Sequence, residues 1–260
     1  MLSMKTKQRM KEALPKWVLH LYWLSKVTRV KLIRWIPAYD EDEILTGHNC
    51  DFMKDVHFRE CYDGAVKDGL AVSEKIHWRA HVACWAGSQA SRLQGDFVEC
   101  GVNKGFLSKI VMDYIGFNKL PKTFYLLDTF EGFVDKYLIE SERRKLEHQE
   151  NIYRPCYEFV KRTFADYGNV RIIKGAVPDT LPEVASNQIA YLSIDMNCVQ
   201  PEIAAAEYFW PKLVPGGIML LDDYGHAGHE LQKMAFDRFA RQYSVPILVL
   251  PTGQGLLIKP

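Results

Sequence analysis

Residues 95–105, Gly95-Asp-Phe-Val-Glu-Cys-Gly-Val-Asn-Lys-Gly105, join an apolar run to a glycine turn and then to a helical pattern. This order of strand, turn and helix is typical of the start of a parallel βαβ unit. A glycine at the turn lets the backbone approach a ligand, and ligands of such sheets lie beyond the carboxyl ends of the strands. The stretch therefore predicts an open α/β sheet with a ligand site next to Gly101.

The same alternation continues to the C-terminus. The expected strands are 97–100, 124–128, 170–174, 190–195, 218–222, 247–250 and 256–259. Helices are expected at 105–115, 157–167, 202–213 and 229–243, with Pro201 in a first turn and Pro215-Gly216-Gly217 ending the third helix. The turn-like link 251–254 makes the last two strands an antiparallel hairpin. We therefore expect a doubly wound, seven-stranded, mostly parallel sheet.

Two segments lie outside this pattern. Residues 1–94 form an N-terminal extension with amphipathic helical patterns at 58–66 and 78–86, ahead of a ligand-binding domain at 95–260. Residues 134–154 are rich in charged side chains and have no strand character. This insertion could be a helical lid above the carboxyl ends of the strands, or a solvated helix.

The N-terminus is strongly basic, because its first 34 residues hold nine Lys and Arg against the single acid Glu12. The apolar, aromatic run 17–24 inside it is shorter than the roughly 20 residues that span a bilayer. A basic aromatic helix could rest on an anionic membrane surface. Packing on the domain or on a second subunit is the favoured alternative, because apolar helical stripes are usually buried.

Composition narrows the class of protein. The 260 residues are 48% hydrophobic and 25% charged, as in ordinary globular proteins, and the net charge of +1 provides no field that would attract nucleic acid. The six cysteines show no C-x-x-C spacing, so neither a zinc site nor a disulfide scaffold is expected. We therefore expect a cytoplasmic homo-oligomer without a nucleic-acid partner, with membrane association through the basic N-terminus as an open alternative.

Two acidic residues indicate which ligand the sheet binds. The turn has the spacing G-x-x-x-G after Glu99, whereas a dinucleotide fingerprint would read G-x-G-x-x-G. A carboxylate there would repel a pyrophosphate but could accept hydrogen bonds from the ammonium group of S-adenosylmethionine. Asp128 ends the second strand and could accept hydrogen bonds from ribose hydroxyls, or it could cap a turn.

Three more carboxylates follow the fourth and fifth strands. Asp195 ends one, and Asp222 and Asp223 end the next. Adjacent parallel strands lie about 4.8 Å apart, so these side chains should converge at one edge of the sheet. Clustered carboxylates repel one another unless something positive joins them. Mg²⁺ or another divalent cation would satisfy this need, and structural hydrogen bonding is the alternative.

Several blocks resemble the macrocin O-methyltransferase family of sugar-modifying enzymes. The blocks are 97–105, 127–132, 175–182, 189–197 and 208–225, the last ending in Asp222-Asp223-Tyr224-Gly225. The resemblance implies a class I, S-adenosylmethionine-dependent O-methyltransferase that acts on a hydroxyl of a sugar or glycosylated small molecule. The chain departs from the family at 196–200, where the family carries a Tyr and a Ser-Thr pair, so the acceptor could differ from macrolide sugars.

The resemblance also implies roles for individual residues. The implied cofactor-binding residues are Glu99, Cys100, Gly101, Asp128, Thr129, Phe130, Gly175, Ala176, Val177 and Asp195. The implied metal ligands are Asp195, Asp222 and Asp223. We expect Asp195 to be the catalytic base, with His226 or His229 as the alternative.

Two rival functions share this sheet. One is a nicotinamide-dependent oxidoreductase, which would need a phosphate-binding turn that the sequence does not show. The other is a catalytically silent methyltransferase-like module that binds a partner through its basic N-terminus. Binding of S-adenosylhomocysteine, of NADH or of neither would separate the three.

Overall fold

The computed structural model describes residues 38–71, 75–146 and 153–260. The chain divides into two compact units at residue 50. The described part of the first unit is an antiparallel hairpin, β1 (Tyr39–Glu41) and β2 (Ile44–Thr46), whose turn residues Asp42 and Glu43 have φ of 52° and 59°. The basic segment 1–34 lies outside the described residues, so the expected membrane contact stays a prediction.

The second unit, Asp51–Pro260, is built on a seven-stranded sheet in the order β5-β4-β3-β6-β7-β9-β8. Its strands are β3 (Asp96–Cys100), β4 (Phe124–Asp128), β5 (Val170–Lys174), β6 (Ile189–Ile194), β7 (Leu213–Leu221), β8 (Leu248–Val249) and β9 (Gly255–Ile258). Pairing is parallel from β5 to β7 and antiparallel at β9. The predicted doubly wound sheet and its C-terminal hairpin are confirmed.

One boundary differs clearly from the expectation. Pro215-Gly216-Gly217 does not end a helix but lies inside β7, which begins at Leu213. The amide of Gly216 donates to the carbonyl of Lys259, and the amide of Lys259 donates to the carbonyl of Gly217, both at 2.8 Å. Pairing with the chain that follows β9 therefore overrides the local turn signal of the Pro-Gly-Gly sequence.

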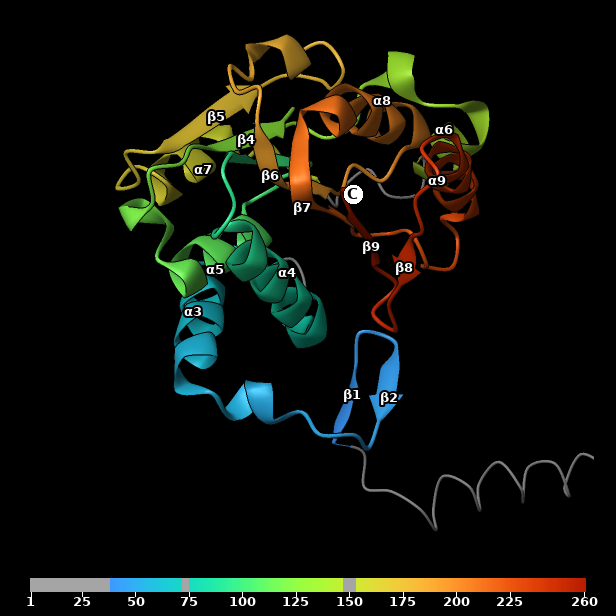
Figure 1. Ribbon diagram of the computed structural model, residues 1–260. Coiled ribbons are helices and arrows are strands. Elements are labelled where there is room, and N and C mark those ends of the chain that lie inside the picture. Colours follow the sequence, from blue (N-terminus) through green and yellow to red (C-terminus); the bar gives the residue numbers. More distant parts are fainter. Residues whose placement is uncertain (1–37, 72–74, 147–152) are drawn as a thin grey trace, which may run out of the picture. The chain divides into compact units, whose positions relative to one another are not determined.

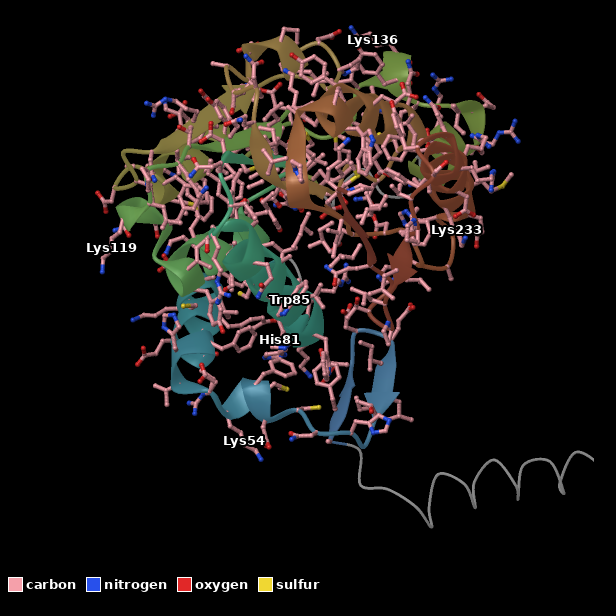
Figure 2. All side chains as sticks on the ribbon, in the orientation of Figure 1. Lys54, His81, Trp85, Lys119, Lys136 and Lys233 are labelled. Atoms are coloured by element: carbon pink, nitrogen blue, oxygen red, sulfur yellow. The ribbon has the colours of Figure 1, made fainter. Side chains whose placement is uncertain are left out.

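Helices cover both faces of the sheet (Figure 1). One core cluster joins the sheet to α8 (Val199–Phe209) and α9 (Glu230–Gln242), and another joins it to α4 (His77–Ala90), α5 (Phe106–Ile115) and α7 (Tyr157–Thr163). Side chains fill the space between these layers (Figure 2). Along β3, Val98 and Cys100 face α8 and α9, whereas Phe97 faces the other layer. Because side chains alternate along a strand, Glu99 shares the face of Phe97.

The helices expected ahead of the sheet belong to the same compact unit as the sheet. They are α3 (Val56–Lys67) and α4, and both pack on α5. Short 3₁₀ turns complete the unit at η1 (Asp51–Lys54), η2 (Phe117–Lys119), η4 (Leu181–Glu183) and η5 (Trp210–Lys212). Within the ranges that the structure describes, none of the helices has the length and apolar character needed to cross a bilayer.

The charged insertion carries two short elements, η3 (Asp135–Tyr137) and α6 (Glu140–Leu146). Tyr137 and Lys136 both bond the carboxylate of Asp179, which follows β5. Val134, Tyr137, Tyr153 and Arg154 line the cavity described below. Both ends of the insertion therefore border the cavity, and the lid stays a prediction.

Candidate active site

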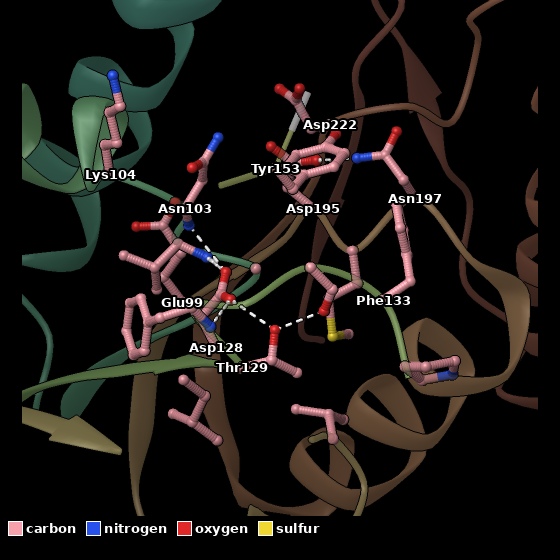
Figure 3. Close-up of a pocket in the computed structure, with 18 of the residues that line it drawn as sticks. Glu99, Asn103, Lys104, Asp128, Thr129, Phe133, Tyr153, Asp195, Asn197 and Asp222 are labelled. Atoms are coloured by element: carbon pink, nitrogen blue, oxygen red, sulfur yellow. Dashed lines mark hydrogen bonds between the residues drawn. The ribbon is translucent and has the colours of Figure 1, made fainter. Parts of the chain in front are cut away.

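A cavity of about 360 Å³ opens at the carboxyl ends of β3, β4, β6 and β7 (Figure 3). Backbone hydrogen bonds continue between these strand ends beyond the regular ladder. The amide of Gly101 donates to the carbonyl of Leu127 at 2.9 Å, and the amide of Asp195 donates to the carbonyl of Cys100 at 2.9 Å. The amide of Asp222 donates to the carbonyl of Ile194 at 3.0 Å. The residues after each strand are therefore held next to one another at the switch point of the sheet, where such folds bind ligands.

Gly101 makes this close approach possible. Its φ is +91°, and a Cβ atom built on it would lie 1.8 Å from the carbonyl oxygen of Asp195. No side chain fits there, and the left-handed backbone favours glycine as well. The glycine predicted from the sequence therefore brings the β3 turn against the residue expected to be the base.

Asp128 ties the two turns beside the cavity together. Its Oδ2 accepts from the amides of Val102 and Asn103 at 2.7 and 2.8 Å, and its Oδ1 accepts from the amide of Phe130 at 2.6 Å. Thr129 Oγ1 also lies 3.3 Å from Oδ1, but its single proton is shared with a shorter bond, of 2.5 Å, to the carbonyl of Gly132. A carboxylate has about four acceptor positions, so the three amide bonds leave about one for a further hydroxyl donor, such as a ribose hydroxyl. Asp128 thus caps the two turns, which is one of the two roles that the sequence left open.

Glu99 lines the cavity from β3 and is almost fully buried. Burial, with the nearby charges of Asp222 and Asp128, raises the pKa of Glu99 well above its usual range. A buried carboxyl group in such a place needs a cationic partner to remain ionised. The ammonium group of a bound S-adenosylmethionine is a partner of this chemistry.

Asp195 follows β6 at the cavity wall, and Nδ2 of Asn197 donates to its Oδ1 at 3.0 Å. Among the described residues, no group donates a hydrogen bond to its Oδ2. Burial, followed by the charges of Asp222 and Asp223, raises the pKa of Asp195 well above its usual range, and the charge of Arg79 acts in the opposite sense. A carboxylate with a raised pKa is a stronger base, as proton abstraction requires.

Asp222 is bound on both sides by other side chains. Nη1 of Arg79, from α4, donates to its Oδ2 at 2.8 Å, and Nε2 of Gln254 donates to its Oδ1 at 3.0 Å. The side chains of Arg79 and Asp222 are only 18% and 7% exposed. The positive group that the acidic cluster requires is therefore supplied by the protein itself.

Asp223 lines the cavity, but the histidines after it do not. Nδ1 of His229 lies 3.6 Å from Oδ2 of Asp223, while the ring of His226 packs against Gly253 in the turn before β9. Tyr224 is buried, and its hydroxyl donates to Asp237. His226, expected as an alternative base, thus does not line the cavity, and its ring packs on the β8–β9 turn.

The residues fit the expected metal ion poorly. Mg²⁺ requires several oxygen ligands in octahedral geometry, but both oxygens of Asp222 already accept hydrogen bonds, one of them from a guanidinium group. Over residues 38–71, 75–146 and 153–260, the structure brings together no group of three metal-ligating side chains suited to a metal ion.

The cavity collects nearly all of the expected cofactor-binding residues. Those that line it are Glu99, Gly101, Asp128, Thr129, Phe130, Gly175, Ala176, Val177 and Asp195. Cys100 is the exception, because strand alternation turns its side chain into the core beneath α8 and α9. The sequence analysis missed the cavity residues Arg79, Asn103, Lys104, Tyr153 and Asn197. Of these, only Asn103 and Lys104 had a local signal, their place in the glycine turn.

A family model described as macrocin O-methyltransferase (TylF) matches residues 79–248, which is more than half of the chain. A tetracenomycin-C rhamnosyl 4'-O-methyltransferase of Streptomyces olivaceus is 30% identical over 52% of this chain and 55% of its own. Mycinamicin III 3''-O-methyltransferase of Micromonospora griseorubida is 27% identical over 76% of this chain and 73% of its own. The match thus spans about half the length of the first of these relatives and nearly three quarters of the second.

Solved structures agree with the observed fold. The O-methyltransferase NovP superposes with a TM-score of 0.66 at 18% identity, covering 81% of this chain and 99% of its own. The calicheamicin methyltransferase CalS11 superposes with a TM-score of 0.59 at 20% identity, covering 69% of this chain and 78% of its own. At these identities the likeness concerns the fold, which is the class I methyltransferase arrangement.

Proposed function

Since the chain belongs to the macrocin O-methyltransferase family, we propose that it transfers a methyl group from S-adenosylmethionine to a hydroxyl of a sugar or glycosylated small molecule. The observation that carries the proposal is that Glu99, Asp128, Asp195 and Gly101 all line one and the same cavity. This acceptor class is supported by one relative named for 4'-O-methylation of a rhamnosyl tetracenomycin and another named for 3''-O-methylation of mycinamicin III.

The cavity has acidic side chains for two parts of S-adenosylmethionine, its ammonium group and its ribose. Glu99 accepts hydrogen bonds from the ammonium group, and the remaining acceptor position of Asp128 receives a ribose hydroxyl. The Gly175–Val177 loop also lines the cavity, and the amide of Gly175 donates to the carbonyl of Asp128 at 2.9 Å. A buried carboxyl next to the glycine turn disfavours the pyrophosphate of a nicotinamide cofactor, so the oxidoreductase alternative has no support from this geometry.

The bound sulfonium supplies a methyl group that is already activated. The protein must then hold the acceptor oxygen opposite the sulfur and remove its proton as the new bond forms. Asp195 is placed to accept this proton at Oδ2, because Asn197 holds its Oδ1. Tyr153 and Arg154, from the lid, line the cavity and are placed to exclude water or contact the acceptor.

Two expectations about partners remain proposals. Leu248, Val249 and Ile258 on the edge hairpin are each at least half exposed, which supports association of this edge with a second copy. Contact with an anionic membrane surface depends on the basic N-terminus, which lies outside the described residues. Neither expectation is needed for the chemistry above.

The function is tested by incubating the protein with S-adenosylmethionine and a panel of rhamnosides and other glycosides, then measuring product mass and S-adenosylhomocysteine. Asp195→Asn should lower kcat by about 10²–10⁴-fold while keeping S-adenosylhomocysteine binding, because only proton removal is impaired. Asp237→Asn, in the Tyr224 and Lys233 network outside the cavity, is the control and should retain activity. Full activity of Asp195→Asn would refute its role as the base.

A further inference from the structure

A positive charge beside the acidic cluster comes from a helix that precedes the sheet. Arg79 lies in the first turn of α4, lines the cavity and forms an ion pair with Asp222 at 2.8 Å. Its side chain is largely buried, at 18% exposed. A buried guanidinium bound to a buried carboxylate is a fixed part of a site, unlike an exposed ion pair.

Gln254, the second partner of Asp222, holds the other oxygen of this carboxylate. Gln254 is fully buried in the turn that leads into β9, and its Oε1 accepts from Thr252 Oγ1 at 2.9 Å. This bond orients the amide so that Nε2 faces Asp222. The carboxylate is therefore held between a cation on one side and an amide donor on the other.

We propose that Arg79 is the resident cation of this active site, taking the place of a divalent metal ion, so that methyl transfer proceeds without one. The guanidinium neutralises the acidic cluster and keeps Asp222 in position beside Asp195. Arg79 is thus a positioning residue, and its ion pair makes Asp222 a poor ligand for a second cation. The role of Arg79 in catalysis rests on the proposed methyl transfer. Its exclusion of a divalent cation from the site can be measured separately.

The direct test is Mn²⁺ binding, followed by the electron paramagnetic resonance of the free ion, for the wild type and Arg79→Met. We expect no binding by the wild type at millimolar Mn²⁺, and an affinity gain of at least about 10-fold in Arg79→Met, because the carboxylate is released. Arg79→Lys keeps the charge and should still exclude Mn²⁺. Arg92→Met, an exposed change beyond the end of α4, is the matched control and should behave as the wild type.

Tight binding of one Mn²⁺ by the wild type would overturn the proposal, as would the absence of any gain in a folded Arg79→Met variant. If that variant does not fold, the wild type and Arg79→Lys decide the question. The second measurement is methyl transfer with excess EDTA, whose rate should be unchanged. Loss of activity with EDTA that Mg²⁺ restores would also refute the proposal. Failure to bind S-adenosylhomocysteine would instead refute the proposed function and leave the Mn²⁺ result standing.

Discussion

At the scale of single residues, the site depends on close contacts that other side chains could not make. Gly101 lies against the backbone of Asp195, and Asp128 accepts three backbone amides that hold the adjoining turns. These residues were identifiable from the sequence because each follows a strand and has a distinctive residue type. Arg79 was not, since it lies 143 residues from Asp222 in the chain and no local pattern links the two.

Gly101→Ala should disrupt both stability and cofactor binding. The new methyl group collides with the Asp195 carbonyl, so we expect the free energy of unfolding to fall by about 2–4 kcal/mol and S-adenosylhomocysteine binding to be lost. Gly64→Ala is the control, because a Cβ there meets nothing within 4 Å inside α3. That change should stabilise the protein by about 0.5–1 kcal/mol. Wild-type affinity in Gly101→Ala would contradict the packing described.

Glu202 makes stability depend on pH. It is buried in the first turn of α8, and burial, followed by the charge of Asp223, raises its pKa well above the ordinary 4.5. The folded state keeps this proton at pH values where the unfolded chain has lost it, so the contribution of Glu202 to stability falls as pH rises above about 4.5.

Glu202→Gln removes that titration. The difference in Tm between the variant and the wild type should therefore grow in favour of the variant between about pH 5 and pH 8. Glu207→Gln, an exposed change on the same helix, is the control and should show no such trend. A difference that stays constant with pH would show that Glu202 is ionised throughout.

At the scale of elements, the carboxylate of Glu142 joins α6 to α8. Oε2 of Glu142 accepts from the amide of Ile139 at 2.9 Å, at the start of α6, and its Oε1 accepts from the amide of Val199 at 2.8 Å, at the start of α8. Cys198, the N-cap of α8, makes no side-chain capping bond. Glu142 therefore supplies, from a distant segment, a cap that the local sequence lacks.

Glu142→Ala should lower the free energy of unfolding by about 2 kcal/mol, because both helix starts lose an acceptor. Glu140→Ala, on the same helix, removes only exposed ion pairs with Arg143 and Arg144 and should change stability by less than about 1 kcal/mol. Urea denaturation of the two variants measures the contrast. Equal losses would mean that the lid is not attached to α8 through Glu142.

The elements themselves were largely predictable. All seven strands of the sheet were located from their apolar runs, which in β6 are buried on both faces. Two boundaries were predicted wrongly because tertiary contacts override local signals. Pro215-Gly216-Gly217 lies within β7 instead of ending a helix, and α8 begins earlier than expected, at Val199, where Glu142 caps it. A metal ion was expected to neutralise the acids because no cation stands near them in the sequence. The guanidinium of Arg79, which pairs with Asp222, comes from a helix ahead of the sheet.

At the scale of the whole molecule, the family match, the class I sheet and the cavity at its switch point all concern the second compact unit. Every described residue that lines the cavity belongs to this unit. The central claim is therefore that this unit binds S-adenosylmethionine between Glu99 and Asp128.

Isothermal titration calorimetry with S-adenosylhomocysteine tests that claim most directly. We expect one binding site per chain, no heat with NADH, and an affinity at least about 10-fold weaker in Asp128→Ala, which loses both the ribose acceptor and the bonds that hold the turns. Binding of NADH, or the absence of S-adenosylhomocysteine binding by the folded wild-type protein, would contradict it.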